Sequence, residues 1–410
     1  MPTCPRLGES VKAISLNVLS ATTAHQQPEW EDSAQVEKIR DVLASLPPLI
    51  EAGSLPTLQR SLADVAAGRA QVLQAGDCAE DPTECTTEHV TRKVSLLNAL
   101  ADVMSTTTGR PVVRVGRIAG QYAKPRSRPT ERVDGVELPV YRGHLVNDPA
   151  ATHAARRPDP RRLLAGYRAA KRTIAELRPG RDAVPAVWTS HEALLLDYEI
   201  PMLRRDRAGR LALTSTHWPW IGERTRQLDG PHVALLAQVV NPVACKVGPT
   251  MTAADLLALC ARLDPMREPG RLTLIARLGA SAVADRLPPL VRAVHAAGHP
   301  VVWLVDPMHG NTVTAASGRK TRVLSTIVRE IVAFQGAVHA EGGVPGGVHL
   351  ETTPDDVVEC IGDDYGTEPI APRYTTLCDP RLNPRQALTA VSAWRASPLT
   401  TRIEEKTCPA

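Results

Sequence analysis

The chain has 410 residues, of which 43% are hydrophobic and 22% charged, and its formal net charge is +4. This balance is typical of a globular protein and excludes a collagen-like, coiled-coil or disordered chain. Its 48 basic and 44 acidic residues are spread along the sequence and aromatic residues make up only 3%, so we expect no nucleic-acid partner.

No segment approaches the roughly 18 consecutive apolar residues of a membrane span, and the N-terminal sequence lacks the pattern of a secretory signal. We therefore expect a cytoplasmic protein with no membrane partner. The eight cysteines form neither a compact disulfide framework nor a paired CxxC zinc motif. Most of them should be reduced.

The chain begins with two predicted helices, in residues 33–46 and 57–68, and we assign residues 1–68 to an N-terminal helical extension or cap. Residues 69–410 then alternate short apolar runs with amphipathic helical patterns, which is typical of a parallel sheet covered by helices. The strands that we expect are 71–75, 111–118, 184–190, 210–216, 242–247, 271–278, 299–306 and 346–351. The helices that we expect among them include 87–104, 161–177, 252–263, 284–298 and 320–340. Eight such units predict a (βα)8 barrel, with 210–216 as its fourth strand.

Ionisable side chains stand at or just after the ends of several predicted strands. These residues are Cys78, Arg117, Lys246, Arg277, His309 and Glu351. A (βα)8 barrel places its active site at the carboxyl ends of its strands, and burying an unpaired charge costs free energy. The pattern therefore favours an active site over simple packing.

One group of these residues offers mixed metal ligands. Cys78, His309 and Glu351, with Asp379 in the late segment CDPRLN, supply sulfur, nitrogen and oxygen, which suits a divalent transition ion better than Ca²⁺ or Mg²⁺. Taken singly, Cys78 is more often a small buried apolar residue and His309 a hydrogen-bonded structural histidine. The metal hypothesis therefore requires the barrel to bring all four together.

A second group is cationic and lies in segments that contain Gly or Pro. Its members are Arg117, Lys124, Arg126, Arg224, Lys246 and Arg277. Guanidinium and ammonium groups suit the recognition of phosphate and carboxylate. Any one of them could instead be a surface charge paired with an acidic residue, but cations at three strand ends favour a site for more than one anionic group.

Several longer motifs follow one another along the chain: QAGDCAE, RIAGQYAKPRS, SHEALLLDYE, WIGERTRQLDG, NPVACKVGP, DPMHGNT, PGGVHLE and CDPRLN. In these motifs the chain resembles the type II 3-deoxy-D-arabino-heptulosonate 7-phosphate (DAHP) synthases, which catalyse the first step of the shikimate pathway. The resemblance implies a (βα)8 barrel and a divalent metal ion, Mn²⁺ or Co²⁺. It also implies the condensation of phosphoenolpyruvate with erythrose 4-phosphate to DAHP and phosphate.

The resemblance further implies roles for individual residues. It makes the metal ligands Cys78, His309, Glu351 and Asp379. It assigns to phosphoenolpyruvate Arg117, Glu223, Arg224, Lys246 and Arg277. It assigns to erythrose 4-phosphate Lys124, Pro125, Arg126, Ser127 and Asp306, the last of which also orients His309. The implied catalytic residues are His309 at the metal, Glu223, which places the water that attacks C2, and Lys124, which donates a proton to the new hydroxyl, with a metal-bound water as the rival donor.

The chain lacks the helical insertion, between AELRPGRDAVPAVWTS and SHEALLLDYE, that carries aromatic effector sites in longer relatives. It is therefore similar to the short forms that serve secondary-metabolite pathways such as phenazine synthesis, and we expect a homo-oligomer, a dimer or larger. Two alternatives stay open: an amino-DAHP synthase, and a catalytically silent paralogue that acts as a regulatory partner. We also predict that Cys378, beside Asp379, forms a redox pair with Cys78, provided that the barrel brings the two thiols close.

Overall fold

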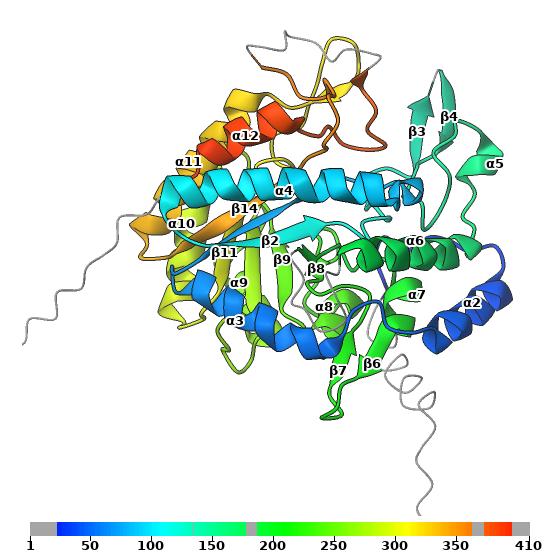
Figure 1. Ribbon diagram of the computed structural model, residues 1–410, viewed down its shortest axis with the longest axis horizontal. Helices are drawn as coiled ribbons and strands as arrows, with labels where there is room; N and C mark the ends of the chain where they lie inside the picture. Colours follow the sequence, from blue (N-terminus) through cyan, green and yellow to red (C-terminus); the bar gives the residue numbers. More distant parts are fainter. Residues whose placement is uncertain (1–22, 134, 178–186, 363–372, 396–410) are drawn as a thin grey trace, which may run out of the picture.

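A curved sheet of eight parallel strands, surrounded by helices, makes up the centre of the molecule (Figure 1). The computed structural model describes residues 23–133, 135–177, 187–362 and 373–395. In chain order the strands of this sheet are β1 (Gln71–Gly76), β2 (Val112–Arg117), β5 (Trp188–Thr189), β8 (Trp220–Ile221), β9 (Val243–Val247), β10 (Leu272–Ala276), β11 (Val302–Val305) and β14 (Pro345–Glu351). Their order in the sheet is β5-β2-β1-β14-β11-β10-β9-β8.

The two edge strands, β5 and β8, meet and close the sheet into a barrel. Trp218 N donates to Thr189 O at 3.1 Å, and Trp220 N donates to His191 O at 3.1 Å. A parallel bridge also joins Glu192 to Trp220. The strands therefore follow one another around the barrel in chain order, which confirms the predicted (βα)8 architecture.

The inside of the barrel is apolar at the end where the strands begin. Val72 of β1 and Val302 of β11 belong to one buried cluster with Leu58, Leu62 and Val65 of α3 (Leu55–Ala66). Because Val72 and Val302 stand near the starts of their strands, α3 covers the amino-terminal end of the barrel. Part of the predicted N-terminal extension thus packs directly on the barrel, while residues 1–22 lie outside the described residues.

The other helices and short 3₁₀ turns follow the strands around the outside. They are α2 (Ser33–Ser45), η1 (Ala52–Ser54), η2 (Pro82–Glu84), α4 (Thr87–Thr108), α5 (His153–Arg156), α6 (Arg161–Leu177), α7 (Leu196–Glu199), η3 (Ile200–Met202), α8 (Pro231–Leu236), α9 (Ala253–Leu263), α10 (Val283–Ala296), α11 (Leu324–Ala340) and α12 (Pro384–Ser392). Thr86, Thr252 and Asn383 cap α4, α9 and α12, each accepting a backbone N–H three residues later. None of the helices among the described residues combines the length and apolar composition that crossing a bilayer requires.

The predicted fourth strand, 210–216, is wrong. Strand β7 (Leu211–Leu213) pairs antiparallel with β6 (Leu203–Arg205), and β8 takes the fourth place in the barrel. The hairpin turn has its own chemistry, since Asp206 Oδ1 accepts from Ala208 N and Arg210 N at 2.9 Å and Gly209 adopts φ +78°. The apolar run was therefore a hairpin strand, whereas the barrel strand itself is only two residues long.

Two other hairpins lie outside the barrel sheet: β3 (Thr130–Val133) with β4 (Val136–Pro139), and β12 (Val313–Thr314) with β13 (Lys320–Thr321). The second one corrects the predicted helix 320–340. Because Lys320 and Thr321 pair with β12, α11 begins only at Leu324. The residues between β13 and α11 are thereby free to enter the site described below.

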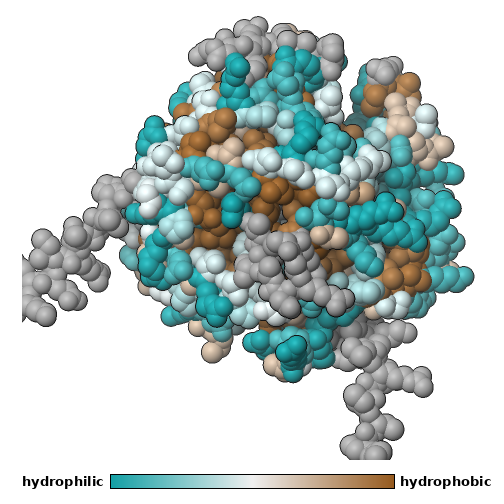
Figure 2. Space-filling view, viewed as in Figure 1, coloured by the Kyte–Doolittle hydropathy of each residue, from teal (hydrophilic) through white to brown (hydrophobic). Residues whose placement is uncertain are grey.

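Apolar surface gathers in the middle of the face that carries α3 and β2 (Figure 2). A crevice here is lined by residues that include Asp64, Val112 and Trp188. Val112 is the first residue of β2, so the crevice lies near the amino-terminal end of the barrel. It is therefore remote from the end at which the ionisable residues collect.

Candidate active site

The predicted site residues collect at the carboxyl end of the barrel because each lies at or after the end of a strand. Arg117 and Glu351 are the last residues of β2 and β14, Lys246 is the fourth residue of β9, and Cys78 follows β1. The remaining members follow other strands, namely Glu223 and Arg224 after β8, Arg277 after β10, and Asp306 and His309 after β11. The parallel register of neighbouring strands brings these ends to the same level.

Three of the four candidate metal ligands converge, although they are far apart in the sequence. His309, Glu351 and Asp379 each offer one ligand atom, and these atoms lie within 4.8 Å of one another. Cys78 borders the same group, since Asp379 N donates to Cys78 Sγ at 3.4 Å. An imidazole and two carboxylates, with a thiol beside them, fit a divalent transition ion.

Glu351 stands at the centre of the charges. Its Oε1 lies 2.9 Å from Arg117 Nη2, 3.3 Å from Lys124 Nζ and 3.2 Å from His309 Nε2, while its Oε2 accepts from Arg322 Nη1 at 2.9 Å. Burial opposes ionisation, but His309, Lys124 and Arg322 outweigh it and hold the pKa of Glu351 well below its usual range. The carboxylate is therefore charged and ready to bind a cation.

Asp306 orients both His309 and Lys246. It accepts from His309 Nδ1 at 2.7 Å and from Lys246 Nζ at 2.5 Å. This bond leaves His309 Nε2 directed to Glu351 and the other ligands. Burial lowers the pKa of Lys246 to about 8, although Asp306 opposes the shift, so the lysine titrates far below its ordinary value.

Arg117 is held by a buried polar chain inside the barrel. Its Nε donates to Asp77 O at 3.0 Å, and its Nη1 donates to His349 Nε2 at 2.6 Å. Burial and the charges of Lys246 and Arg117 hold the pKa of His349 well below its ordinary value. The neutral ring then carries its proton on Nδ1, which donates to Gln74 Oε1 at 2.6 Å. Gln74 therefore fixes the tautomer that accepts from Arg117.

Arg277 is tied to the loop after β11. Its Nη2 donates to His309 O at 2.9 Å. Behind it, Glu330 of α11 is fully buried and accepts from Gly279 N at 2.8 Å and from Asn311 Nδ2 at 2.5 Å. Burial raises the pKa of Glu330 to about 7. This carboxyl group joins the loops that carry Arg277 and His309.

The residues predicted for the two substrates meet at the mouth of the site. Lys124 Nζ lies 3.3 Å from Asp379 Oδ2, and Ser127 Oγ accepts from Arg224 Nη2 at 2.5 Å. Burial would lower the pKa of Lys124, but Glu351 and Asp379 raise it above its ordinary value, so the side chain is cationic. Pro125 lies between these residues in the chain and is half-buried. The two predicted substrate groups thus form one continuous surface.

Two further predicted residues have acidic or basic neighbours of their own. Glu223 Oε1 accepts from Arg226 Nη2 at 2.8 Å, whereas its Oε2 is buried without a hydrogen-bond partner among the described residues. Arg126 donates to Glu131 Oε2 at 2.8 Å and, through Nη1, to Cys378 Sγ at 3.3 Å.

Cys78 and Cys378 are both free thiols, and burial raises the pKa of each.

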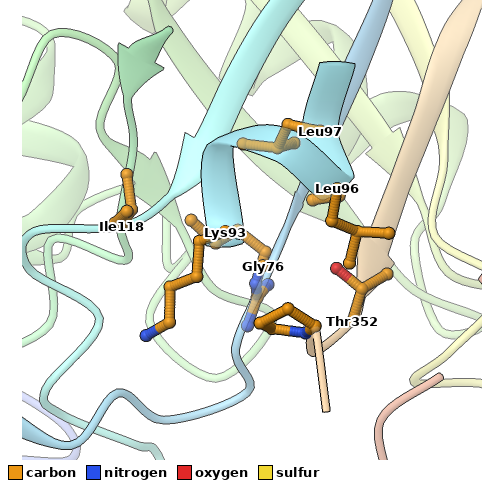
Figure 3. A pocket seen from close by; sticks show the side chains of 9 residues that line it. Gly76, Lys93, Leu96, Leu97, Ile118 and Thr352 are labelled. Carbon is orange, nitrogen blue, oxygen red and sulfur yellow. The ribbon is translucent and has the colours of Figure 1, made fainter. Parts of the chain in front are cut away.

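A small crevice lies behind Arg117, between α4 and the ends of β1 and β14. Its lining includes Gly76, Lys93 and Thr352 (Figure 3). The Lys93 Nζ lies 2.8 Å from Asp77 Oδ2 and 2.7 Å from Glu84 Oε2. This lysine therefore supports the segment after β1 from behind and is already paired.

Residues at the site that were not predicted include Glu192, Arg322 and His349. Arg322 was assigned to the helix 320–340, which begins later. A signal for His349 was available, because residues two apart on a strand share a face and His349 precedes Glu351 by two. Glu192 lies in SHEALLLDYE, where its carboxyl group had no distinguishing feature in the sequence alone.

The fold and the site together define a class of protein: a (βα)8-barrel enzyme with a metal-type donor set surrounded by cations. Comparison with known proteins gives the family. The model of the Class-II DAHP synthetase family matches residues 14–186 and 181–393. The chain is 57% identical over 381 residues to a probable phospho-2-dehydro-3-deoxyheptonate aldolase of Pseudomonas fluorescens, covering 92% of this chain and 95% of that protein.

Other relatives agree with this assignment. The phospho-2-dehydro-3-deoxyheptonate aldolase of Streptomyces coelicolor is 42% identical over 418 residues, which cover 89% of this chain and 93% of that protein. The solved structure of the Francisella tularensis SCHU S4 phospho-2-dehydro-3-deoxyheptonate aldolase has 12% identity and a TM-score of 0.52, with 87% of this chain and 97% of that chain covered, and supports the fold alone. The chain belongs to the Class-II DAHP synthetase family. It is a DAHP synthase, an enzyme of the first step of the shikimate pathway, as its motifs predicted.

Proposed function

We propose that this DAHP synthase condenses phosphoenolpyruvate with erythrose 4-phosphate through the residues that converge at the carboxyl end of the barrel. The observation that carries the proposal is the meeting of His309, Glu351 and Asp379 beside Cys78, within a ring of arginines and lysines. These four residues would hold the metal ion. When bound, a divalent ion supplies Lewis-acid polarisation of a carbonyl oxygen.

The cations of the site bind and orient the two phosphorylated reactants. Arg117, Lys246 and Arg277 would fix phosphoenolpyruvate, and Arg126 and Ser127 the phosphate of the aldose, so that two separate molecules react as an oriented pair. Glu223, one carboxyl oxygen of which has no hydrogen-bond partner within the described part of the chain, would hold the water that adds at C2. C3 of phosphoenolpyruvate bonds to the aldehyde carbon, and the aldehyde oxygen takes a proton to become the new hydroxyl. Phosphate then leaves C2 of the tetrahedral adduct, and the hydroxyl that water added there loses its proton and becomes the ketone.

Lys124 is our candidate donor of the proton to the new hydroxyl. It is buried and cationic and lies 3.3 Å from both Glu351 Oε1 and Asp379 Oδ2, at the edge of the metal-type site. Lys124→Arg keeps the charge but donates a proton poorly. We expect it to lower kcat more than it raises the KM of erythrose 4-phosphate, whereas equal kcat values would exclude this role.

The experiment that tests the proposal follows phosphate release from phosphoenolpyruvate and erythrose 4-phosphate by the purified chain with added Mn²⁺. We expect activity that chelation abolishes and Mn²⁺ or Co²⁺ restores. His309→Ala should lose both bound metal and activity, while a surface control, His153→Ala, should keep both. Full activity of His309→Ala after exhaustive chelation would contradict the metal assignment.

We further propose that the chain is a short form dedicated to a secondary-metabolite pathway, and that it acts as a cytoplasmic homo-oligomer. In support, α6 ends at Leu177 and β5 begins at Trp188, which leaves no length for an inserted effector-binding domain. We expect activity insensitive to phenylalanine, tyrosine and tryptophan, and a particle larger than a monomer in sedimentation. Assays with the amino analogue of erythrose 4-phosphate distinguish an amino-DAHP synthase, and inactivity with both aldoses would favour the silent-paralogue alternative.

A further inference from the structure

We propose that Glu192 is a further substrate-contacting residue, whose carboxyl group accepts a hydrogen bond from a chain hydroxyl of the acceptor sugar phosphate. This inference rests on the proposed function, because it concerns the second substrate of the same reaction. It is carried by a buried carboxyl oxygen at the edge of the candidate site that has no hydrogen-bond partner among the described residues.

The backbone of Glu192 is fixed at the carboxyl end of the third barrel strand. Its N–H donates to Gln121 Oε1 at 3.0 Å, and the residue bridges to Trp220 of β8. The side chain lies over Gly222, where an added Cβ would stand 2.0 Å from Glu192 Oε1. The absence of a side chain at position 222 therefore provides the space that the carboxyl group occupies.

This carboxyl group is buried and yet unsatisfied. Glu192 is 9% exposed, and its Oε1 has no hydrogen-bond partner in the described part of the chain. By contrast, Glu351 and Glu330 are also buried, but both oxygens of each accept hydrogen bonds. Leaving a buried carboxyl oxygen unpaired costs free energy, so its retention indicates a partner that arrives with the substrate.

The surroundings place Glu192 between the two predicted substrate groups. Lys124, Lys246, His309 and Arg224 all act on it electrostatically, and they come from four different strand ends. Within the ranges that the structure describes, none of them donates a hydrogen bond to its Oε1. Burial raises the pKa of the Glu192 carboxyl in spite of these cations. Glu192 therefore lies among cations that belong to both predicted substrate groups.

The chemistry of the reactants selects the partner. Phosphoenolpyruvate carries carboxylate and phosphate oxygens but no hydroxyl group, so it offers no hydroxyl donor to a carboxyl oxygen. Erythrose 4-phosphate carries hydroxyls at C2 and C3, next to the reacting aldehyde. A hydroxyl donates readily to a carboxyl oxygen, which accepts hydrogen bonds. The acceptor aldose is therefore the substrate that Glu192 suits.

The test combines substitutions with substrate analogues in the full chain with Mn²⁺. Glu192→Leu removes the acceptor at similar volume, and Glu192→Gln retains one acceptor oxygen. With erythrose 4-phosphate we expect kcat/KM to fall by about 10- to 100-fold for Leu and less for Gln. With the 2-deoxy or the 3-deoxy aldose, whichever lacks the contacted hydroxyl, wild type and Glu192→Leu should differ by less than about threefold.

Two further measurements separate this role from a structural one. Because Oε1 has no hydrogen-bond partner among the described residues, Glu192→Leu should unfold at the same temperature as wild type or higher. Replacing a structural residue would instead lower the unfolding temperature. Gly222→Ala displaces the carboxyl group from the other side and should show the same dependence on the deoxy aldoses. An equal loss with all three aldoses, or no loss, overturns the inference. Inactivity of the wild type with both natural substrates would instead overturn the proposed function.

Discussion

Replacing Glu330 with glutamine makes the stability of the protein less dependent on pH. Glu330 is fully buried, and burial raises its pKa from an ordinary value of 4.5 to about 7. The folded protein therefore binds this proton more tightly than the unfolded chain does. The resulting contribution to stability is fully present below about pH 4.5 and is lost as the pH rises through about 7.

The size of the effect follows from these two values. The separation between 4.5 and about 7 corresponds to about 3 kcal/mol in total. About 2 kcal/mol of it falls between about pH 5.5 and 7.5. Glutamine does not titrate, but its amide group faces the donors Gly279 N and Asn311 Nδ2. This mismatch lowers the free energy of unfolding by an amount that does not depend on pH. Only the pH dependence of the difference in unfolding free energy between wild type and Glu330→Gln reports the titration of Glu330.

The assay is urea unfolding of the metal-free protein, followed by tryptophan fluorescence at both pH values. Between pH 5.5 and 7.5 the free energy of unfolding of Glu330→Gln should gain about 2 kcal/mol relative to wild type. Glu37→Gln on the exposed face of α2 is the matched control and should show no such change. A wild-type-to-Glu330→Gln difference that is the same at both pH values would refute the reasoning.

Three further predictions concern the site itself. Burial lowers the pKa of Lys246 to about 8, so kcat/KM for phosphoenolpyruvate should fall above about pH 8. Lys246→Arg should move this fall to higher pH, because arginine keeps its charge. A wild-type kcat/KM that does not change with pH in this range would exclude the role of Lys246. Arg322→Met removes the donor to Glu351 Oε2 and should weaken metal binding about 10- to 100-fold in a metal titration, and unchanged affinity would contradict the contact's role. Oxidation should form a disulfide between Cys78 and Cys378 and release the metal. The reaction should be slow, because burial raises the pKa of both thiols. If oxidant inactivates the protein while mass spectrometry shows both thiols still free, the redox pair is disproved.

The rhythm of apolar runs and amphipathic helices was enough to predict the barrel, because each strand buried on both faces reads as a short apolar segment. The prediction of the fourth strand failed because there an apolar segment does not mark a barrel strand. The apolar segment 211–213 is buried in a hairpin outside the barrel, while the true fourth strand, Trp220–Ile221, is too short to form a recognisable run. Its pairing with β9 and with the chain after β5 defines it, and both are tertiary contacts.

The sequence alone determined the family and the identity of the charged residues at the strand ends, since these residue types and motifs are local and their order along the chain is direct evidence. Only the tertiary structure decided which of them meet. The distances among His309, Glu351 and Asp379, the bond from Arg322 to Glu351, and the unpaired oxygen of Glu192 depend on the curvature and closure of the sheet. Hydrogen bonding and desolvation act over a few ångströms in space, whereas these residues are separated by tens to hundreds of positions in the chain.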